Sequence, residues 1–483
     1  MENNKIIFSL FSTLCFFSVS IQTIAQKKNR PNIILIVADD HGIDALGCYG
    51  NPVIKTPALD ALARDGIRFT NAFCTTSSCS PSRSVILSGL HNHANGMYGL
   101  EHDFHHFGAL DKIKSLPVFL SENGYQTVRV GKFHVAPEKV FKFDLVLSEG
   151  AANDNNSLGR SAIIMADKCE KVFHETDKPF FLYFAVDDPH RDLPFNTWPS
   201  PNSFGNRKEG YPGEKQIIYN PDSVLIPYFL PDIPQCRKEL AQYYQSVSRL
   251  DQGVAKLISL LKKAGRYDDT LIIYISDNGI AFPGAKTTLY DPGIKLPCIV
   301  KLPEQRHKSR VTDAMISWVD ITPTILDYAK ALPPEPSFHG KSFKTVLEDV
   351  NSNNTVGWDE IYASHTLHEV TMYYPMRVVR NRKFKLIWNI AHELDFPFAW
   401  DLIESTTWKG IMAGTDKYLG KRKVENFINR HEFELYDLRN YPEELINLSS
   451  DPHYADILEE LKVKIKDFQK RTGDPWFYKW EYE

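Results

Sequence analysis

Residues 74–90 combine a cysteine with the signals of a helix start, in the sequence CTTSSCSPSRSVILSGL. Ser80 is a preferred N-cap residue and Pro81 suits the first helical position, so we predict a helix that begins just after Cys79. The N-terminus of such a helix offers unpaired N–H groups and a positive dipole end to an anion. Arg83, one turn further on, can bind the same anion through its planar guanidinium. The stretch therefore predicts an anion site with a cysteine beside it.

Polar residues follow directly on four apolar runs of strand length. The runs are residues 33–38, 127–130, 180–186 and 271–275, and the polar clusters after them are Asp39-Asp40, Lys132-Phe133-His134, Asp187-Asp188-Pro189-His190 and Asp277-Asn278. Continuous apolar runs are typical of strands covered on both faces, as in a parallel sheet between helices. Because ligands collect at the carboxyl ends of such strands, we predict that the four clusters form one site.

Two of these clusters contain only oxygen ligands. Asp39, Asp40, Asp277 and Asn278 suit calcium or magnesium better than zinc or copper. A single aspartate at a strand end is more often an N-cap or turn residue. Two such pairs, each at a strand end, favour a metal site.

The string Cys79-Ser80-Pro81-Ser82-Arg83, followed by Leu87-Ser88-Gly89, resembles the Cys-x-Pro-x-Arg signature of the type I sulfatases, with its Leu-Thr/Ser-Gly tail. This resemblance implies that a sulfatase-maturating enzyme oxidises Cys79 to formylglycine, whose hydrated aldehyde is the nucleophile. It also implies one bound Ca²⁺ per chain. Its ligands in this sequence are Asp39, Asp40, Asp277, Asn278 and residue 79.

The same resemblance assigns roles to the remaining polar residues. Lys132 and Arg83 bind sulfate, and His134 hydrogen-bonds a hydroxyl of the hydrated formylglycine. His190 is the general acid, and its ordinary pKa of about 6.5 suits proton transfer near neutrality. Lys286 completes the cationic site, although we expect arginine there in the relatives that the chain resembles most. Taken alone, His190 and Lys286 are an ordinary surface histidine and a solvated loop lysine.

Within the sulfatases the chain is most similar to the sulfamidases, the N-sulfoglucosamine sulfohydrolases of heparan sulfate breakdown. The most distinctive segment is residues 368–377, which includes His368, Glu369 and Arg377. The resemblance implies release of the N-linked sulfate from non-reducing-end N-sulfoglucosamine in heparin or heparan sulfate fragments. The three named residues then contact the sugar, or they form ion pairs in a loop between domains.

Other functions remain open at this point. An O-sulfatase acting on another glycan, for example on glucosamine 6-O-sulfate, would have the same core. A phosphatase or phosphonate hydrolase of the alkaline-phosphatase-like superfamily lacks support, because the His/Asp set of a multi-zinc site is missing. A non-catalytic sulfoglycan-binding protein would need a broken site, and every matched position is intact.

The intervening segments must form the helices that hold these strand ends in place. Helices are predicted over residues 56–66, 116–122 and 234–264 from their caps and apolar spacing. Alternating strands and helices predict an α/β fold with a large, mostly parallel sheet between helices. After residue 360 we expect a small antiparallel subdomain. It has a hairpin over residues 376–388, a strand at 434–438 and a closing helix at 455–470.

The predicted organisation is a signal peptide (1–25), a catalytic domain (26–360) and a C-terminal subdomain (361–483), with a surface insertion near the site at 191–233. The signal peptide has a mostly apolar run over residues 6–24 and a cleavage site after Ala25, which predicts a secreted or periplasmic protein. No later apolar run is long enough to span a membrane. A net charge of −4 gives no support to nucleic-acid binding. The spacing of the cysteines matches neither a disulfide framework nor a zinc site. A dimer is one open possibility for the oligomeric state.

Overall fold

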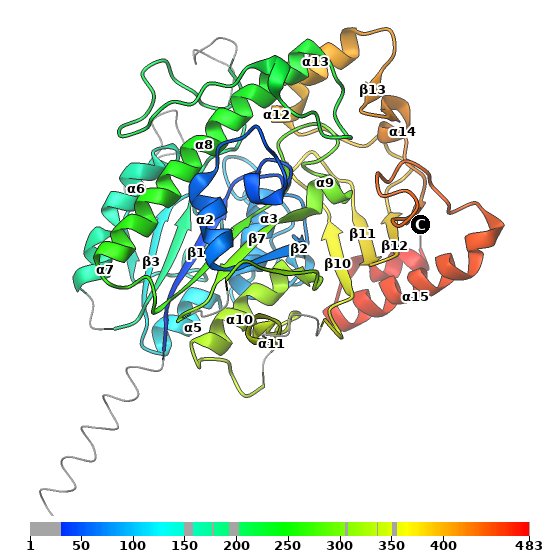
Figure 1. The fold of residues 1–483 in the computed structure, drawn as a ribbon. Coiled ribbons are helices and arrows are strands. Elements are labelled where there is room, and N and C mark those ends of the chain that lie inside the picture. The colour runs from blue at the N-terminus through cyan, green and yellow to red at the C-terminus, as the bar shows by residue number, and fades with distance from the viewer. Residues whose placement is uncertain are drawn as a thin grey trace, which may run out of the picture.

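The computed structural model describes residues 30–148, 158–175, 178–192, 202–304, 308–335, 337–349 and 355–482. The predicted signal peptide lies outside these ranges. The described chain forms a large sheet between helices, with a smaller sheet beside it (Figure 1). Among the described residues no helix is long and apolar enough to cross a membrane. The six cysteines in these ranges are all free.

The large sheet has nine strands in the order β4-β3-β5-β1-β6-β7-β2-β8, with β9 paired to β2. Its strands are β1 (Asn32–Ala38), β2 (Ile67–Phe73), β3 (Gln126–Gly131), β4 (Leu145–Val146), β5 (Phe180–Ala185), β6 (Thr270–Ser276), β7 (Lys295–Lys301), β8 (Arg310–Thr312) and β9 (Ile316–Ser317). The first five strands in this order, β4, β3, β5, β1 and β6, are parallel to one another. Strand β7 is antiparallel to both of its neighbours, β6 and β2. The predicted α/β fold with a mostly parallel sheet is confirmed.

The register of the central strands brings the predicted polar clusters to one edge. Ala38 at the end of β1 lies opposite Ser276 at the end of β6. Ala185 at the end of β5 pairs with Gly131 of β3 and with Val37 of β1. Because these four strands are parallel and end at the same level, the residues that follow them leave the sheet side by side.

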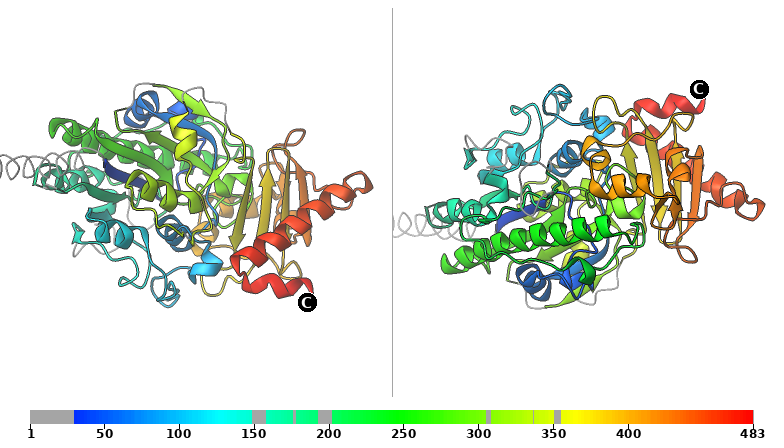
Figure 2. Two further views of the ribbon diagram at one scale, coloured as in Figure 1. Left: turned by 90° about the horizontal axis from the view of Figure 1, so that it is seen from below. Right: turned by 90° about the horizontal axis from the view of Figure 1, so that it is seen from above.

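Helices cover both faces of the large sheet, and they are shown from two further directions in Figure 2. The helices are α2 (Pro57–Asp65), α3 (Cys79–Ser88), α4 (Asn92–Asn95), α5 (Leu116–Glu122), α6 (Ala162–Lys168), α7 (Glu170–Glu175), α8 (Pro234–Lys263), α9 (Asp291–Ile294), α10 (Ile321–Tyr328), α11 (Lys344–Glu348), α12 (Trp400–Ile403), α13 (Thr406–Ala413), α14 (Val424–Ile428) and α15 (Ala455–Thr472). Alternate residues of β1 point to opposite faces. Ile34 and Ile36 join the core under α2, α6 and α8. Leu35 and Val37 join the core that contains α3, α5 and α10. The three helices predicted from caps and spacing are α2, α5 and α8.

The smaller sheet is antiparallel, with the order β10-β11-β12-β15. Its strands are β10 (Glu360–His365), β11 (Met376–Asn381), β12 (Phe384–Asn389) and β15 (Phe433–Asp437), and β13 (Tyr418–Leu419) pairs separately with β14 (Arg422–Lys423). Leu461 and Ile465 of α15 pack on this sheet. The predicted hairpin, third strand and closing helix are confirmed, and β10 adds a strand that we did not predict. Ser364 of β10 donates its N–H to Thr75 O, so this sheet contacts the segment before α3.

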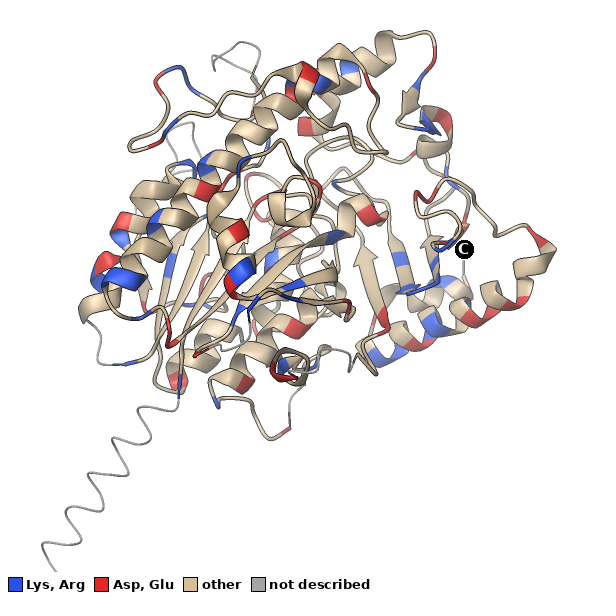
Figure 3. Ribbon diagram, in the orientation of Figure 1, with Lys and Arg blue, Asp and Glu red and all other residues tan. Residues whose placement is uncertain are grey.

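Charged residues are distributed over both parts of the fold. Figure 3 shows lysine and arginine interspersed with acidic residues, for example along α15. The part of the predicted insertion that the structure describes, residues 202–233, packs along α8. Tyr219 there shares a hydrogen bond of 2.6 Å with Ser248.

Candidate active site

Helix α3 presents Cys79 from its first turn, but its N-cap differs from the prediction. The helix begins at Cys79 itself and its N-cap is Ser78, an extended residue with φ −158°, whose carbonyl accepts a hydrogen bond from Ser82 N. The Ser80 hydroxyl instead accepts from Glu101 N at 3.2 Å. The predicted N-cap Ser80 was therefore wrong. The last extended residue before the helix is Ser78, and Ser80 already lies in the first helical turn. The Cys79 side chain lies inside the protein, with the residue 1% exposed.

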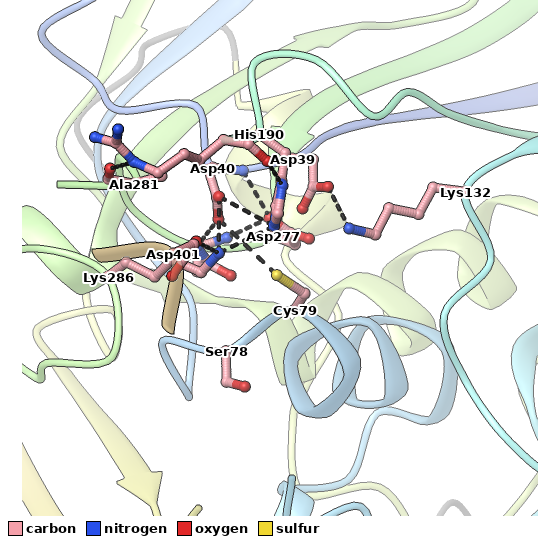
Figure 4. Close-up of polar contacts among 12 residues, drawn as sticks. Asp39, Asp40, Ser78, Cys79, Lys132, His190, Asp277, Ala281, Lys286 and Asp401 are labelled. Carbon is pink, nitrogen blue, oxygen red and sulfur yellow. Dashed lines mark hydrogen bonds and ion pairs between the residues drawn. The ribbon is translucent and has the colours of Figure 1, made fainter. Parts of the chain in front are cut away.

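The structure brings the two predicted oxygen pairs together against Cys79 (Figure 4). Ligand atoms of Asp39, Asp40, Cys79 and His190 all lie within 4.8 Å of one another. Asp277 Oδ1 accepts from Asp40 N at 3.1 Å. These residues come from the ends of β1, β5 and β6 and from the start of α3. Their meeting at one edge follows from the parallel register described above.

Asn278, which follows Asp277, closes this cluster on one side. Its Nδ2 donates to Asp40 Oδ1 at 2.5 Å, while its Oδ1 is buried without a hydrogen-bond partner. Asp39 Oδ1 is likewise buried without one. Buried unpaired oxygens are costly unless something binds them. Several carboxylate and amide oxygens around one point are the ligands that hard divalent cations prefer, so the residues fit such an ion.

The electrostatics of the cluster also favour a cation. Burial, followed by repulsion from Asp39, raises the pKa of Asp277 to about 8. Burial raises the pKa of Asp40 to about 6, against the attraction of Lys286. Burial opposes ionisation of Asp39 too, but Lys132 and other nearby cations hold its pKa well below the ordinary value. Without an added positive charge, the cluster therefore retains protons that aspartate loses in water.

Three buried or nearly buried cations surround the same point. The Arg83 side chain is 0% exposed, and its Nε donates to Asp277 Oδ2 at 2.8 Å. Lys132 forms an ion pair with Asp39. Lys286 Nζ lies 2.9 Å from Asp40 Oδ2, so it belongs to the cluster rather than to a solvated loop. These groups can bind the oxygens of a tetrahedral anion placed beside Cys79.

The two predicted histidines differ in how closely they approach the cluster. His190 Nδ1 bonds the Arg191 carbonyl, while Nε2 lies 3.1 Å from Lys286 Nζ. Burial and the nearby Lys286 hold the pKa of His190 well below its ordinary value. His134 Nε2 bonds His102 Nδ1 at 2.6 Å, and His134 lines the same cavity as Cys79. Both histidines are therefore available to a ligand in that cavity.

The cavity above Cys79 has a volume of 490 Å³, within the range of small-molecule sites. His368 lies in its wall and shares a hydrogen bond of 2.8 Å with Ser78, the N-cap of α3. Glu369 also lines the cavity and accepts a hydrogen bond from Trp400 N at 2.8 Å. Both residues, which the sequence analysis named as candidate sugar contacts, therefore line the cavity.

Arg377 does not belong with this pair and is a correction to the predicted set. Its guanidinium is 0% exposed and forms an ion pair with Asp474, with Nη2 2.8 Å from Oδ1. It is not among the residues that line the cavity. Arg377 joins β11 to the residues after α15, and this is the structural alternative that the sequence left open.

Several cavity residues were not predicted. They are Leu100, His102, Asp103, Arg160, Arg191, Asp192, Trp400 and Asp401. Arg191 directly follows a predicted cluster, whose member Asp187 also lines the cavity, and so it had a weak local signal. Trp400 and Asp401 begin the four-residue helix α12, and nothing in their local sequence marks them. Asp401 is 115 residues from Lys286, and among the site segments only 368–369 is nearer in sequence.

The site and fold define a class of protein that comparison with known families identifies. Residues 31–331 match the family model described as Sulfatase. This match covers more than half of the chain and includes Cys79 and both aspartate clusters. The chain belongs to the sulfatase family.

A second match narrows this assignment. Residues 284–407 match the model described as N-sulphoglucosamine sulphohydrolase, C-terminal. The chain is 40% identical to N-sulphoglucosamine sulphohydrolase of Homo sapiens over 472 residues, covering 93% of this chain and 92% of that protein. It is 24% identical to an N-acetylglucosamine-6-O-sulfatase of Bacteroides thetaiotaomicron, covering 93% and 88%.

Solved structures support the same fold. One is a protein in complex with its substrate D-glucosamine-2-N,6-O-disulfate, with a TM-score of 0.67, 22% identity and coverage of 92% of this chain and 99% of that one. Another is a phosphonate monoester hydrolase of Agrobacterium radiobacter, with a TM-score of 0.65, 19% identity and coverage of 92% and 96%. At these identities the likeness establishes the fold alone.

Proposed function

We propose that this protein is a calcium-dependent sulfatase that removes the N-linked sulfate from N-sulfoglucosamine at the non-reducing end of heparin or heparan sulfate fragments. The observation that carries the proposal is the composition of the cavity wall. Lys286, His368 and Glu369 lie within the segment that matches N-sulphoglucosamine sulphohydrolase, and all three line the cavity that contains Cys79. The segment that separates this branch from other sulfatases therefore contacts the space where the sugar would bind.

Two groups complete the chemistry. A maturating enzyme would convert Cys79 to formylglycine, whose hydrated aldehyde supplies the nucleophilic oxygen. Asp39, Asp40, Asp277 and Asn278 would hold one Ca²⁺, which supplies positive charge to the sulfuryl oxygens. The buried Asn278 Oδ1, which accepts no hydrogen bond, supports this assignment.

The other residues then have defined tasks. Arg83, Lys132 and Lys286 bind the sulfuryl oxygens and stabilise the charge that builds there during transfer. His190 Nε2 would pass the proton of the attacking formylglycine hydroxyl to the sulfamate nitrogen. The O–S bond then forms as the S–N bond breaks with its electron pair going to nitrogen, and loss of the second hydroxyl's proton later expels sulfate and restores the aldehyde. The bond from His190 Nδ1 to the Arg191 carbonyl holds the ring so that Nε2 faces the cluster. His134, which lines the same cavity as Cys79, would hydrogen-bond a hydroxyl of residue 79 in its hydrated form.

The sequence supports an exported enzyme, with residues 1–25 as its signal peptide. Export would bring the enzyme to extracellular or periplasmic polysaccharide. In such a compartment calcium is plentiful, so the cluster of Asp39, Asp40, Asp277 and Asn278 could bind its ion there.

Sulfate release from a defined panel tests the proposed function. Mature protein from the native host is incubated with N-sulfoglucosamine, glucosamine 6-O-sulfate and N-acetylglucosamine 6-O-sulfate, and its residue-79 peptide is analysed by mass. We expect release from N-sulfoglucosamine by protein that carries formylglycine. Release only from the two 6-O-sulfates would instead support an O-sulfatase, and an unconverted thiol with no release would support a binding protein.

A further inference from the structure

Asp401 is a cavity carboxylate with no role in the scheme above. It is the second residue of α12 and its side chain is 19% exposed. It lines the cavity together with Cys79 and His190. Figure 4 shows it beside Lys286, close to Asp40.

The contacts of Asp401 place its charge beside the proposed proton donor. Asp401 Oδ2 lies 2.9 Å from Lys286 Nζ. The same nitrogen lies 3.1 Å from His190 Nε2 and 2.9 Å from Asp40 Oδ2. Asp401 Oδ1 is buried and makes no hydrogen bond. The carboxylate therefore keeps unused acceptor capacity, and one lysine is shared between two acids.

The other cations near Asp401 already face acids of their own. Arg191 is paired with Glu239 at 2.8 Å, and Lys132 is paired with Asp39. Arg160 pairs with Asp188 at 3.0 Å. A leaving group that sits near His190 and Lys286 is therefore exposed to the field of Asp401.

The sign of the charge on the leaving atom differs between the two kinds of sulfate. In a sulfamate, nitrogen takes up a proton before the S–N bond breaks, so it carries a positive charge until the S–N electron pair returns to it and the neutral amine departs. In a sulfate ester, the S–O electron pair moves to oxygen, which becomes more negative until it is protonated. A fixed carboxylate stabilises the first change and opposes the second.

We propose that Asp401 is a specificity-determining residue that favours N-linked over O-linked sulfate. The proposal rests on the proposed function, since it explains the preference of the same site. It also explains why a carboxylate is held in a cavity that must bind an anion. Its ion pair with Lys286 holds its charge close to His190, which serves the leaving nitrogen in the proposed function.

The test compares two substrates in three variants. Wild type, Asp401→Asn and Asp401→Glu are assayed with N-sulfoglucosamine and with 4-nitrophenyl sulfate, an O-ester. Glu404→Gln is the matched control, because it removes one charge from the same segment at an exposed ion pair with Lys409. We expect Asp401→Asn to lower the ratio of kcat/KM for sulfamate over ester by about 10- to 100-fold, mainly through kcat. Asp401→Glu keeps the charge and should keep most of the ratio.

Other results would overturn the inference. If Asp401→Asn slows both substrates by the same factor, the carboxylate only positions Lys286. An unchanged ratio would refute it as well. A wild-type enzyme that hydrolyses the ester but not the sulfamate would instead refute the proposed function, before any variant is compared.

A second measurement needs no variant and so does not depend on the folding of Asp401→Asn. Inhibition of the wild type by glucosamine, a cation below pH 7, is compared with inhibition by neutral N-acetylglucosamine. We expect glucosamine to bind about 10-fold more tightly, because the product ammonium replaces the positive leaving nitrogen. Equal or weaker inhibition by glucosamine would contradict the role of Asp401.

Discussion

Calcium should stabilise this protein much more at pH 8 than at pH 5, because the ion and protons compete for the same carboxylates. In the metal-free fold, burial and Asp39 raise the pKa of Asp277 to about 8, and burial raises that of Asp40 to about 6. Both groups ionise near pH 4 in an unfolded chain. Between about pH 4 and pH 8 the folded protein keeps protons on these two carboxyls that the unfolded chain has already lost. The metal-free fold therefore loses stability as the pH rises through this range.

The size of the effect follows from the proton that the ion must displace. At pH 5 Asp277 lies about three pH units below its pKa, so its deprotonation costs about 4 kcal/mol, and Asp40 adds about 1 kcal/mol. At pH 8 the combined cost is close to zero. We therefore expect saturating calcium to raise the free energy of unfolding by about 4–5 kcal/mol more at pH 8 than at pH 5.

The assay is urea unfolding of dialysed, metal-free protein with and without calcium at each pH, with ionic strength matched by potassium chloride. Asp277→Asn should lose most of the calcium effect. Asp251→Asn is the matched control, because Asp251 is another buried aspartate with a raised pKa of about 7, but it binds N–H groups of α2 instead. Calcium stabilisation that is equal at both pH values, or larger at pH 5, would refute the assignment of these carboxylates as ion ligands.

Two further predictions concern single residues. His190→Asn should lower kcat for N-sulfoglucosamine by about 10²- to 10⁴-fold with a smaller change in KM, because the leaving nitrogen loses its proton donor; a change confined to KM in steady-state assays would contradict that role. Arg377→Met should lower the free energy of unfolding by about 3–5 kcal/mol, because Asp474 is left charged and buried, while KM is unchanged. Adding Asp474→Asn should restore part of that loss in urea unfolding, and a raised KM in the single variant would indicate sugar contact after all.

Much of the large sheet could be predicted because its central strands carry strong local signals. The four apolar runs became β1, β3, β5 and β6, and polar residues follow each of them. Strands β2 and β7 were missed, because β2 includes the polar residues Arg68 and Asn71 and β7 includes Pro297. The edge strand β10, which pairs with β11 alone in the smaller sheet, also lacks a distinct pattern.

The site residues also fall into those that local sequence could predict and those that it could not. Cys79, Arg83 and the aspartate pairs belong to compact motifs, so their residue types and spacing were sufficient to select them. Arg377 belongs to an equally distinctive segment, yet its partner Asp474 is 97 residues away and occupies the guanidinium completely. No local pattern could separate it from His368 and Glu369.

The sequence by itself determined which side chains can do chemistry and that they follow strands of a buried sheet, because apolar runs, caps and short motifs are local properties. Only the tertiary structure decided which of them meet. Parallel register brings Asp40 and Asp277 into contact across 237 residues, and the return of α12 to the cavity adds Asp401. Such contacts depend on the packing of distant segments, and that packing leaves no signature at the individual residue.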